Sequence, residues 1–79
     1  MIPLYGFVEG DTIGLVVLAD EQDTMADLAR RLQESAALRV APCEAATVWF
    51  NGAPVGDATS VEAAGMRPLD RFDVRGGRP

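Results

Sequence analysis

Apolar stretches bounded by turn residues predict strands near both ends of the chain. Ile2–Val8 and Ile13–Ala19 are rich in aliphatic and β-branched residues and flank the turn sequence Glu9-Gly10-Asp11, so we expect a β-hairpin. Arg71–Arg75 alternates between charged and apolar residues, which is typical of a strand with one buried face. We therefore expect the apolar residues of this last strand to point inward.

A second hairpin is predicted in the middle of the chain. Thr47–Phe50 has strand propensity, and Asn51-Gly52 directly after it is a strong two-residue hairpin turn. The returning strand around Val55 is short and contains Pro54, which cannot donate a backbone hydrogen bond. This strand is therefore expected at an edge of the sheet.

The segment between the two hairpins has the spacing of an amphipathic helix. Thr24 and Asp27 stand at the positions of a capping box, with Thr24 as N-cap, and the helix is expected to end near Leu38. Farther on, Ser60 and Gly65 predict one short helical turn between an N-cap and a C-terminal glycine. The apolar residues on one face of the long helix are Met25, Leu28, Ala29, Leu32 and Ala36.

The predicted order of elements, β-β-α-β-β-(short helix)-β, points to one fold. One helix covers one face of a sheet, which gives a two-layer α+β domain. The last strand must return between the two hairpins to complete the sheet, and this arrangement is the ubiquitin-like β-grasp. We expect a mixed sheet of four to five strands packed on one amphipathic helix, with the domain at residues 1–75 and a flexible Gly-Gly tail at 76–79.

Charge and composition narrow the class of partner. Seven basic residues, all Arg, against twelve acidic residues give a formal net charge of −5, which disfavours nucleic acid and anionic membrane surfaces. The longest apolar run, Leu15–Ala19, is far shorter than a membrane span of about 20 residues. A single cysteine fits a reducing compartment, and we expect a cytoplasmic protein.

Candidate chemistry is sparse. The chain has no histidine, and Cys43 stands beside Glu44, whose charge is expected to raise the pKa of the thiol. Asp20, Glu21 and Asp23 crowd one loop but lack the ligand spacing of a calcium loop, so we interpret them as a solvated acidic loop. No catalytic, cofactor-binding or metal-ligating residue is expected in this chain.

The widely spaced glycines of GFVEGDTIG (residues 6–14) do not form a phosphate-binding loop. We assign Gly6, Gly10 and Gly14 to hairpin turns.

Trp49, the one tryptophan, is the strongest candidate for a binding residue. Alternation along Thr47–Phe50 places it on the face opposite Val48 and Phe50. With the last strand as its neighbour, Trp49 is expected to lie among Arg71 and Arg75 on the open face of the sheet. It is then either an anchor of a partner surface or a surface tryptophan stacked on an arginine.

The tail Gly76-Gly77-Arg78-Pro79 suggests an alternative. Ubiquitin-like modifiers and sulfur carriers present a reactive carboxylate after a terminal Gly-Gly pair. Use of Gly77 in this way would first require removal of Arg78-Pro79.

Several segments together resemble one family. The chain is similar to the small third (gamma) subunit of bacterial multicomponent monooxygenase hydroxylases of the toluene monooxygenase group, from Pro3 to Val74. The segments are Pro3-Leu4 with Phe7 and Asp11, Leu15–Leu18, Asp23–Met25 leading into Leu28-Ala29, Arg39–Pro42, Thr59–Pro68 and Asp73-Val74.

The resemblance implies a function. In that family a large subunit holds a carboxylate-bridged di-iron centre, a companion subunit completes the hydroxylase, and electrons come from NADH through separate proteins. The gamma subunit supplies no iron ligand, so this chain is expected to be a non-catalytic structural subunit that binds the large subunit. Arg39, Val40 and Pro42, in one of the resembling segments, join Trp49, Arg71 and Arg75 as candidate partner-binding residues. A modifier or sulfur carrier and a stand-alone ubiquitin-like adaptor remain the alternatives.

Overall fold

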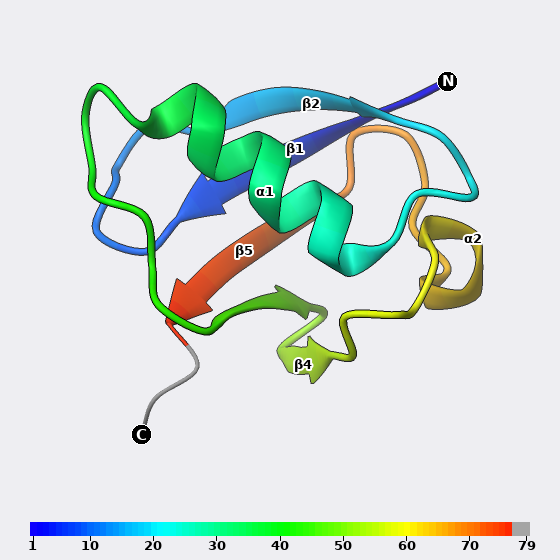
Figure 1. Cartoon of the computed structure of the whole chain (residues 1–79). Coiled ribbons are helices and arrows are strands. Elements are labelled where there is room, and N and C mark those ends of the chain that lie inside the picture. Colours follow the sequence, from blue (N-terminus) through cyan, green and yellow to red (C-terminus); the bar gives the residue numbers. More distant parts are fainter. Residues whose placement is uncertain (77–79) are drawn as a thin grey trace.

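A computed structural model describes residues 1–76 of the chain. Within them the elements follow the predicted order: β1 (Ile2–Val8), β2 (Leu15–Ala19), α1 (Met25–Ala36), β3 (Ala46–Phe50), β4 (Ala53–Val55), α2 (Val61–Ala64) and β5 (Arg71–Gly76). The strands form one five-stranded sheet in the order β2-β1-β5-β3-β4 (Figure 1). β5 lies parallel to β1 and antiparallel to β3, so the last strand does return between the two hairpins. The β-grasp prediction is confirmed.

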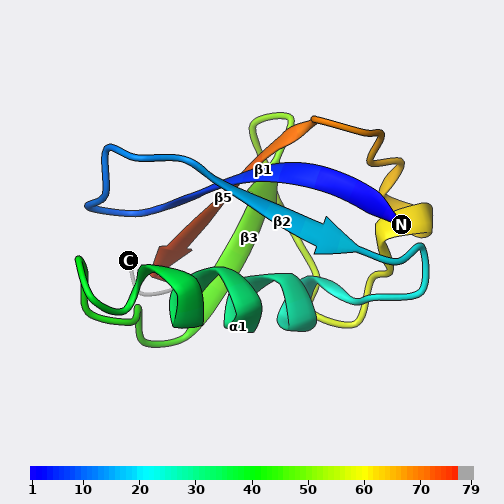
Figure 2. The same cartoon turned by 90° about the horizontal axis from the view of Figure 1, so that it is seen from above.

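Helix α1 covers one face of the sheet, as Figure 2 shows from above. Its apolar residues lie where the helical spacing predicted them, and Leu28 and Leu32 have no exposed surface. Full burial of such a side chain contributes about 1.5–3 kcal/mol. From the sheet, Val48, Phe72 and Val74 complete the same core, so the strand parity inferred from the sequence is correct.

The capping box of α1 is present as predicted. The Asp27 backbone N–H donates to the Thr24 hydroxyl at 3.3 Å, and the Thr24 N–H donates to the Asp27 carboxylate at 3.0 Å. The helix ends at Ala36 rather than near Leu38, because Leu38 is fully exposed and has no core surface to pack on. For α2, Ser60 is the N-cap and Gly65 takes a left-handed conformation with φ of 77°, both as predicted.

The starts of the two helices bond to one another. A helix leaves its first backbone N–H groups without partners inside the helix. Here each helix finds acceptors in the segment that leads into the other. The bonds run from Met25 to Thr59 O (2.9 Å), from Ala26 to Asp57 O (3.1 Å), from Val61 to Asp23 O (2.8 Å) and from Glu62 to Glu21 O (3.1 Å).

The structure confirms some of the turns predicted from the sequence and corrects one. Asn51 and Gly52 both have positive φ, at 54° and 81°, as a two-residue turn with the twist of a hairpin requires, and β4 with its proline forms a sheet edge. Gly10 has a positive φ of 90° in the β1–β2 turn. Gly6, however, lies inside β1 and points into the core, so its assignment to a turn is wrong.

Strand β2 begins at Leu15 instead of Ile13. The Ile13 N–H donates to the Asp11 carboxylate at 3.1 Å, which holds this part of the chain in a turn. Gly14 lies under the Phe7 ring, where an added Cβ would come within 2.6 Å of a ring carbon.

Candidate partner-binding surface

Three of the candidate residues, Trp49 on β3 and Arg71 and Arg75 on β5, lie on the face of the sheet that is turned away from α1. Side chains alternate along each strand, so the neighbours of the buried residues point outward. We call these outward residues the open face: Pro3, Tyr5, Phe7, Val16, Leu18, Thr47, Trp49, Pro54, Arg71, Asp73 and Arg75.

Two arginines of β5 stack on aromatic rings of the neighbouring strands. The guanidinium carbon of Arg75 lies 4.6 Å from the centre of the Trp49 ring, and that of Arg71 lies 4.0 Å from the centre of the Phe7 ring. Tyr5 packs edge-on against Phe7 with ring centres 5.2 Å apart. Each exposed cation–π contact contributes about 0.5–1 kcal/mol. The predicted position of Trp49 among the arginines of the last strand is confirmed.

Asp73 lies between the two arginines. Its carboxylate contacts Arg71 Nε at 2.9 Å and the guanidinium of Arg75 at 3.8 Å. The Asp73 carboxylate holds the pKa of Arg71 above its ordinary value, so this cation stays charged. The three charged residues are thus fixed in one row, with an aromatic ring on each side.

The open face differs in charge from the rest of the chain. Strands β1, β2, β3 and β4 have no charged residue, and β5 contributes two arginines and one aspartate, a net charge of +1. The whole chain has a net charge of −5. A hollow of about 320 Å³ opens beside the row, lined by Trp49, Asn51, Gly52, Arg71, Asp73 and Arg75. The face therefore offers cations and aromatic rings to a binding partner.

The other three candidates lie elsewhere, in the segment between α1 and β3. Arg39 makes a two-point ion pair with Asp11, at 2.7 and 3.1 Å, and this pair holds the pKa of the Asp11 carboxyl below its ordinary value. Val40 packs on the core. Pro42 lines a groove of about 460 Å³ beside α1, together with Cys43. The structure does not bring these three residues to the open face, and their role in partner binding stays a prediction.

The Cys43 thiol has a raised pKa, as expected, but for a different reason. Burial is the main cause, and the charge of Glu9 adds to it, whereas the sequence had indicated the adjacent Glu44. The Cys43 backbone N–H also donates to the Gln33 side chain at 2.6 Å.

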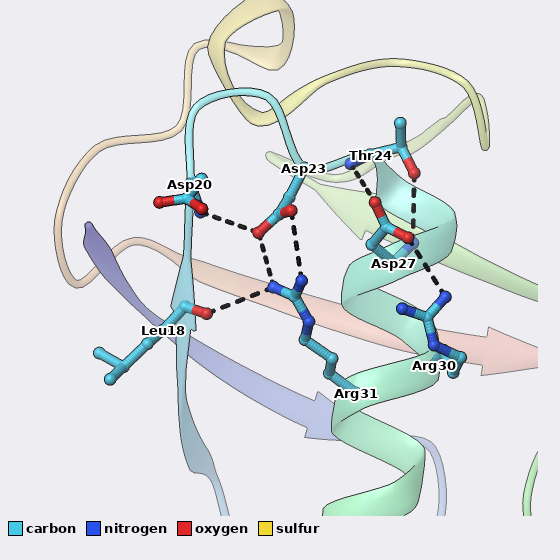
Figure 3. Close-up of polar contacts among 7 residues, drawn as sticks. All are labelled: Leu18, Asp20, Asp23, Thr24, Asp27, Arg30 and Arg31. Carbon is cyan, nitrogen blue, oxygen red and sulfur yellow. Dashed lines mark hydrogen bonds and ion pairs between the residues drawn. The ribbon is translucent and has the colours of Figure 1, made fainter.

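In the acidic loop, Asp20 and Glu21 are exposed as predicted, whereas Asp23 is held by specific contacts. Asp23 forms an ion pair with Arg31 at 2.6 Å and accepts the Asp20 backbone N–H at 2.8 Å (Figure 3). Arg31 holds the pKa of the Asp23 carboxyl below its ordinary value. Within residues 1–76, no three histidine, cysteine, aspartate or glutamate side chains are arranged so that they could hold a metal ion. In the same part of the chain, no helix is long and apolar enough to cross a membrane. Gly77, on which the modifier alternative depends, lies outside the described residues.

Comparison with known proteins decides the family. The family model of toluene-4-monooxygenase system protein B (TmoB) matches residues 1–75. The chain belongs to the TmoB family. The resemblance inferred from the sequence is thereby confirmed, and membership identifies the chain as a protein component of a monooxygenase system of this type. No individual curated protein sequence matches the chain.

Solved structures share the fold of this TmoB-family chain. A chain of the toluene 4-monooxygenase HD complex with the inhibitor 4-bromobenzoate superposes with a TM-score of 0.86 at 23% identity, covering 95% of this chain and 96% of that one. The ubiquitin of Caldiarchaeum subterraneum gives 0.76 at 14% identity, covering 99% and 95% of the two chains. A designed protein based on ubiquitin gives 0.81 at 19% identity, covering 99% and 90%.

Proposed function

We propose that this TmoB-family chain is a non-catalytic structural subunit of a multicomponent di-iron monooxygenase hydroxylase acting on aromatic or alkene substrates. It binds the large subunit, which holds the iron, beside a companion subunit. The family match over residues 1–75 supports this assignment, as does the similarity in fold to a chain of the toluene 4-monooxygenase HD complex. Oxygen activation and the NADH-dependent supply of electrons belong to the other proteins of the system.

One observation carries the choice of surface: the row of Arg71, Asp73 and Arg75 between the Phe7 and Trp49 rings. Tryptophan and arginine are the residue types most enriched among binding hot spots. The planar guanidinium groups are already held on the rings, so little side-chain entropy is lost when a partner carboxylate binds them. The partner surface that fits is acidic at its centre, where it meets β5, and apolar on either side.

The test is binding of the full chain to the purified large and companion subunits, measured by calorimetry. Trp49→Ala should weaken binding by about 30-fold, which corresponds to about 2 kcal/mol. The variant should still unfold cooperatively, because Trp49 lies outside the core. Arg75→Ala should weaken binding in the same direction.

Arg67→Ala is the matched control for Arg75→Ala. Arg67 is also exposed and cationic but lies before β5, outside the open face. The chosen surface is wrong if Trp49→Ala binds as tightly as the parent chain. The assigned function is wrong if the chain, isolated from its native cell, carries no di-iron hydroxylase subunit with it.

A further inference from the structure

The two edges of the sheet are protected very differently. At one edge, β4 is three residues long and contains Pro54, features that prevent a further strand from pairing. At the other edge, β2 has the sequence LVVLA over Leu15–Ala19, with no proline and no charge. An edge strand of this kind presents open backbone groups that can pair with another strand.

The register shows which backbone groups face outward. Tyr5 donates its N–H to Asp70 O on the β5 side, so alternation turns Leu4 toward β2. Leu4 pairs with Val17, whose backbone groups therefore point back to β1. The backbone groups of Val16 and Leu18 therefore point away from β1, to the outer edge of the sheet.

Part of this edge is already closed by a side chain. Arg31, held by Asp23, donates to the Leu18 carbonyl at 3.4 Å, as Figure 3 shows. Among residues 1–76, the backbone N–H and carbonyl of Val16 and the N–H of Leu18 have no hydrogen-bond partner across this edge. Two donors and one acceptor in a row match an extended chain laid alongside.

The side chains around this edge define what such a chain would contain. Val16 and Leu18 are 60% and 57% exposed, so aliphatic residues of an added strand would find apolar partners. A groove of about 470 Å³ runs between β2 and α1, lined by Val16, Val17, Leu18, Arg31, Glu34 and Ser35.

Charge decides between the possible occupants of the groove. Glu34 has no ion-pair partner among residues 1–76, and Asp20 and Glu21 follow β2 directly. Acidic residues therefore outnumber the one cation that lines the groove, Arg31, which is itself paired with Asp23. A second copy of the chain, with net charge −5, would bring acid against acid, whereas a segment with basic flanks would be attracted.

From these features we infer that the edge of β2 receives an extended apolar segment of another protein, flanked by basic residues, as a sixth strand of the sheet. Main-chain hydrogen bonds to Val16 and Leu18 hold the segment, and its flanking cations lie near Glu34 and Asp20. This site is separate from the arginine row of β5. The proposal for the β2 edge holds whichever protein binds the arginine row.

The experiment uses the full chain and a defined probe, the acetylated and amidated hexapeptide Lys-Val-Ile-Val-Ile-Lys. Backbone amide exchange followed by NMR should slow at Val16 and Leu18 as the peptide is added up to about 1 mM, while Val17, already bonded to β1, stays unchanged. The counterpart with Glu at both ends should bind at least about tenfold more weakly. Unchanged exchange at Val16 and Leu18, or equal binding of the two peptides, would overturn the proposal.

Two variants distinguish the contribution of the Val16 backbone N–H to peptide binding from that of its side chain. Val16→Pro removes one edge donor and should weaken binding by about tenfold, whereas Val16→Thr keeps the donor and the β-branch and should stay within about threefold. If Val16→Pro does not fold, the exchange data on the parent chain still decide the question.

A dimer seen by sedimentation and abolished by Val16→Pro would assign the edge to a second copy and so refute the proposal. Because no hydroxylase subunit is present in these measurements, their failure leaves the proposed function untouched.

Discussion

Substitution of Gly6 tests how closely α1 approaches the sheet. Gly6 lies in β1 between the inward residues Leu4 and Val8, and an added Cβ would stand 2.8 Å from both Leu32 Cδ2 and Phe72 Cζ. Carbon atoms in ordinary contact are about 3.5–4.0 Å apart. Leu32 and Phe72 are fully buried, so neither side chain has open space to move into.

We expect Gly6→Ala to lower the free energy of unfolding by about 1–2 kcal/mol. Overpacking of a core typically costs about 1–3 kcal/mol, and the lower entropy of the unfolded chain returns about 0.4–1 kcal/mol. For a domain of this size the change lowers Tm by roughly 4–16 °C. Urea and thermal unfolding of the full chain, followed by circular dichroism, measure both quantities.

The chain offers a matched control in Gly56→Ala. There the added Cβ would meet only the Thr59 hydroxyl, at 3.5 Å, which is an ordinary contact. This variant should be as stable as the parent or slightly more so. Equal stability of Gly6→Ala and Gly56→Ala would refute the packing argument.

A double-mutant cycle identifies the contact itself. Leu32→Ala alone should cost about 2–5 kcal/mol because it leaves a cavity. In the Gly6→Ala/Leu32→Ala double variant the new methyl group occupies part of that cavity, so the total loss should be smaller than the sum by about 1 kcal/mol. Strict additivity would mean that Leu32 is not the residue that excludes a side chain at position 6.

Three further outcomes are expected. Leu28→Ala should cost about 2–5 kcal/mol of stability, whereas Leu38→Ala, at a fully exposed position, should change it by less than about 0.5 kcal/mol. A Leu28→Ala variant that unfolds at the same temperature as the parent chain would contradict the helix placement. Arg31 lowers the pKa of Asp23 in the folded state, so the folded chain binds fewer protons than the unfolded one. The stabilisation is complete above the ordinary value of 3.8 and is lost as pH falls through the folded-state pKa. Unfolding across this pH range should therefore be less pH-dependent in Arg31→Met than in the parent. Burial raises the pKa of Cys43 above its ordinary value of 9.0, so a disulfide reagent should react slowly at pH 8 and faster once guanidinium unfolds the chain; equal rates would refute this.

Sequence patterns predicted the features of this fold that depend on neighbouring residues. The capping box of α1 is formed by two residues three positions apart, and Asn51-Gly52 contains its own turn geometry. One-sided burial imposes alternation, which is why the outward position of Trp49 followed from a strand of four residues.

Features that join distant segments were not predictable in the same way. Gly6 looks like a turn glycine beside Gly10, and only the docking of α1 shows why it has no side chain. The ion pair of Arg39 with Asp11 spans 28 positions, and the charge of Glu9 reaches Cys43 across the fold. No local spacing encodes such contacts, because tertiary packing alone brings these residues together.

The reciprocal bonds between the starts of α1 and α2 limit where the chain length can vary. Residues 20–24 and 56–60 must reach each other in register, and one inserted residue displaces the chain by about 3.3–3.6 Å, more than a hydrogen bond tolerates. A change in either segment would release donors from both helices at once. The α1–β3 connection, residues 37–45, is under no such reciprocal constraint. Among proteins built on this scaffold, insertions and deletions should therefore gather in that connection and be rare at the helix starts.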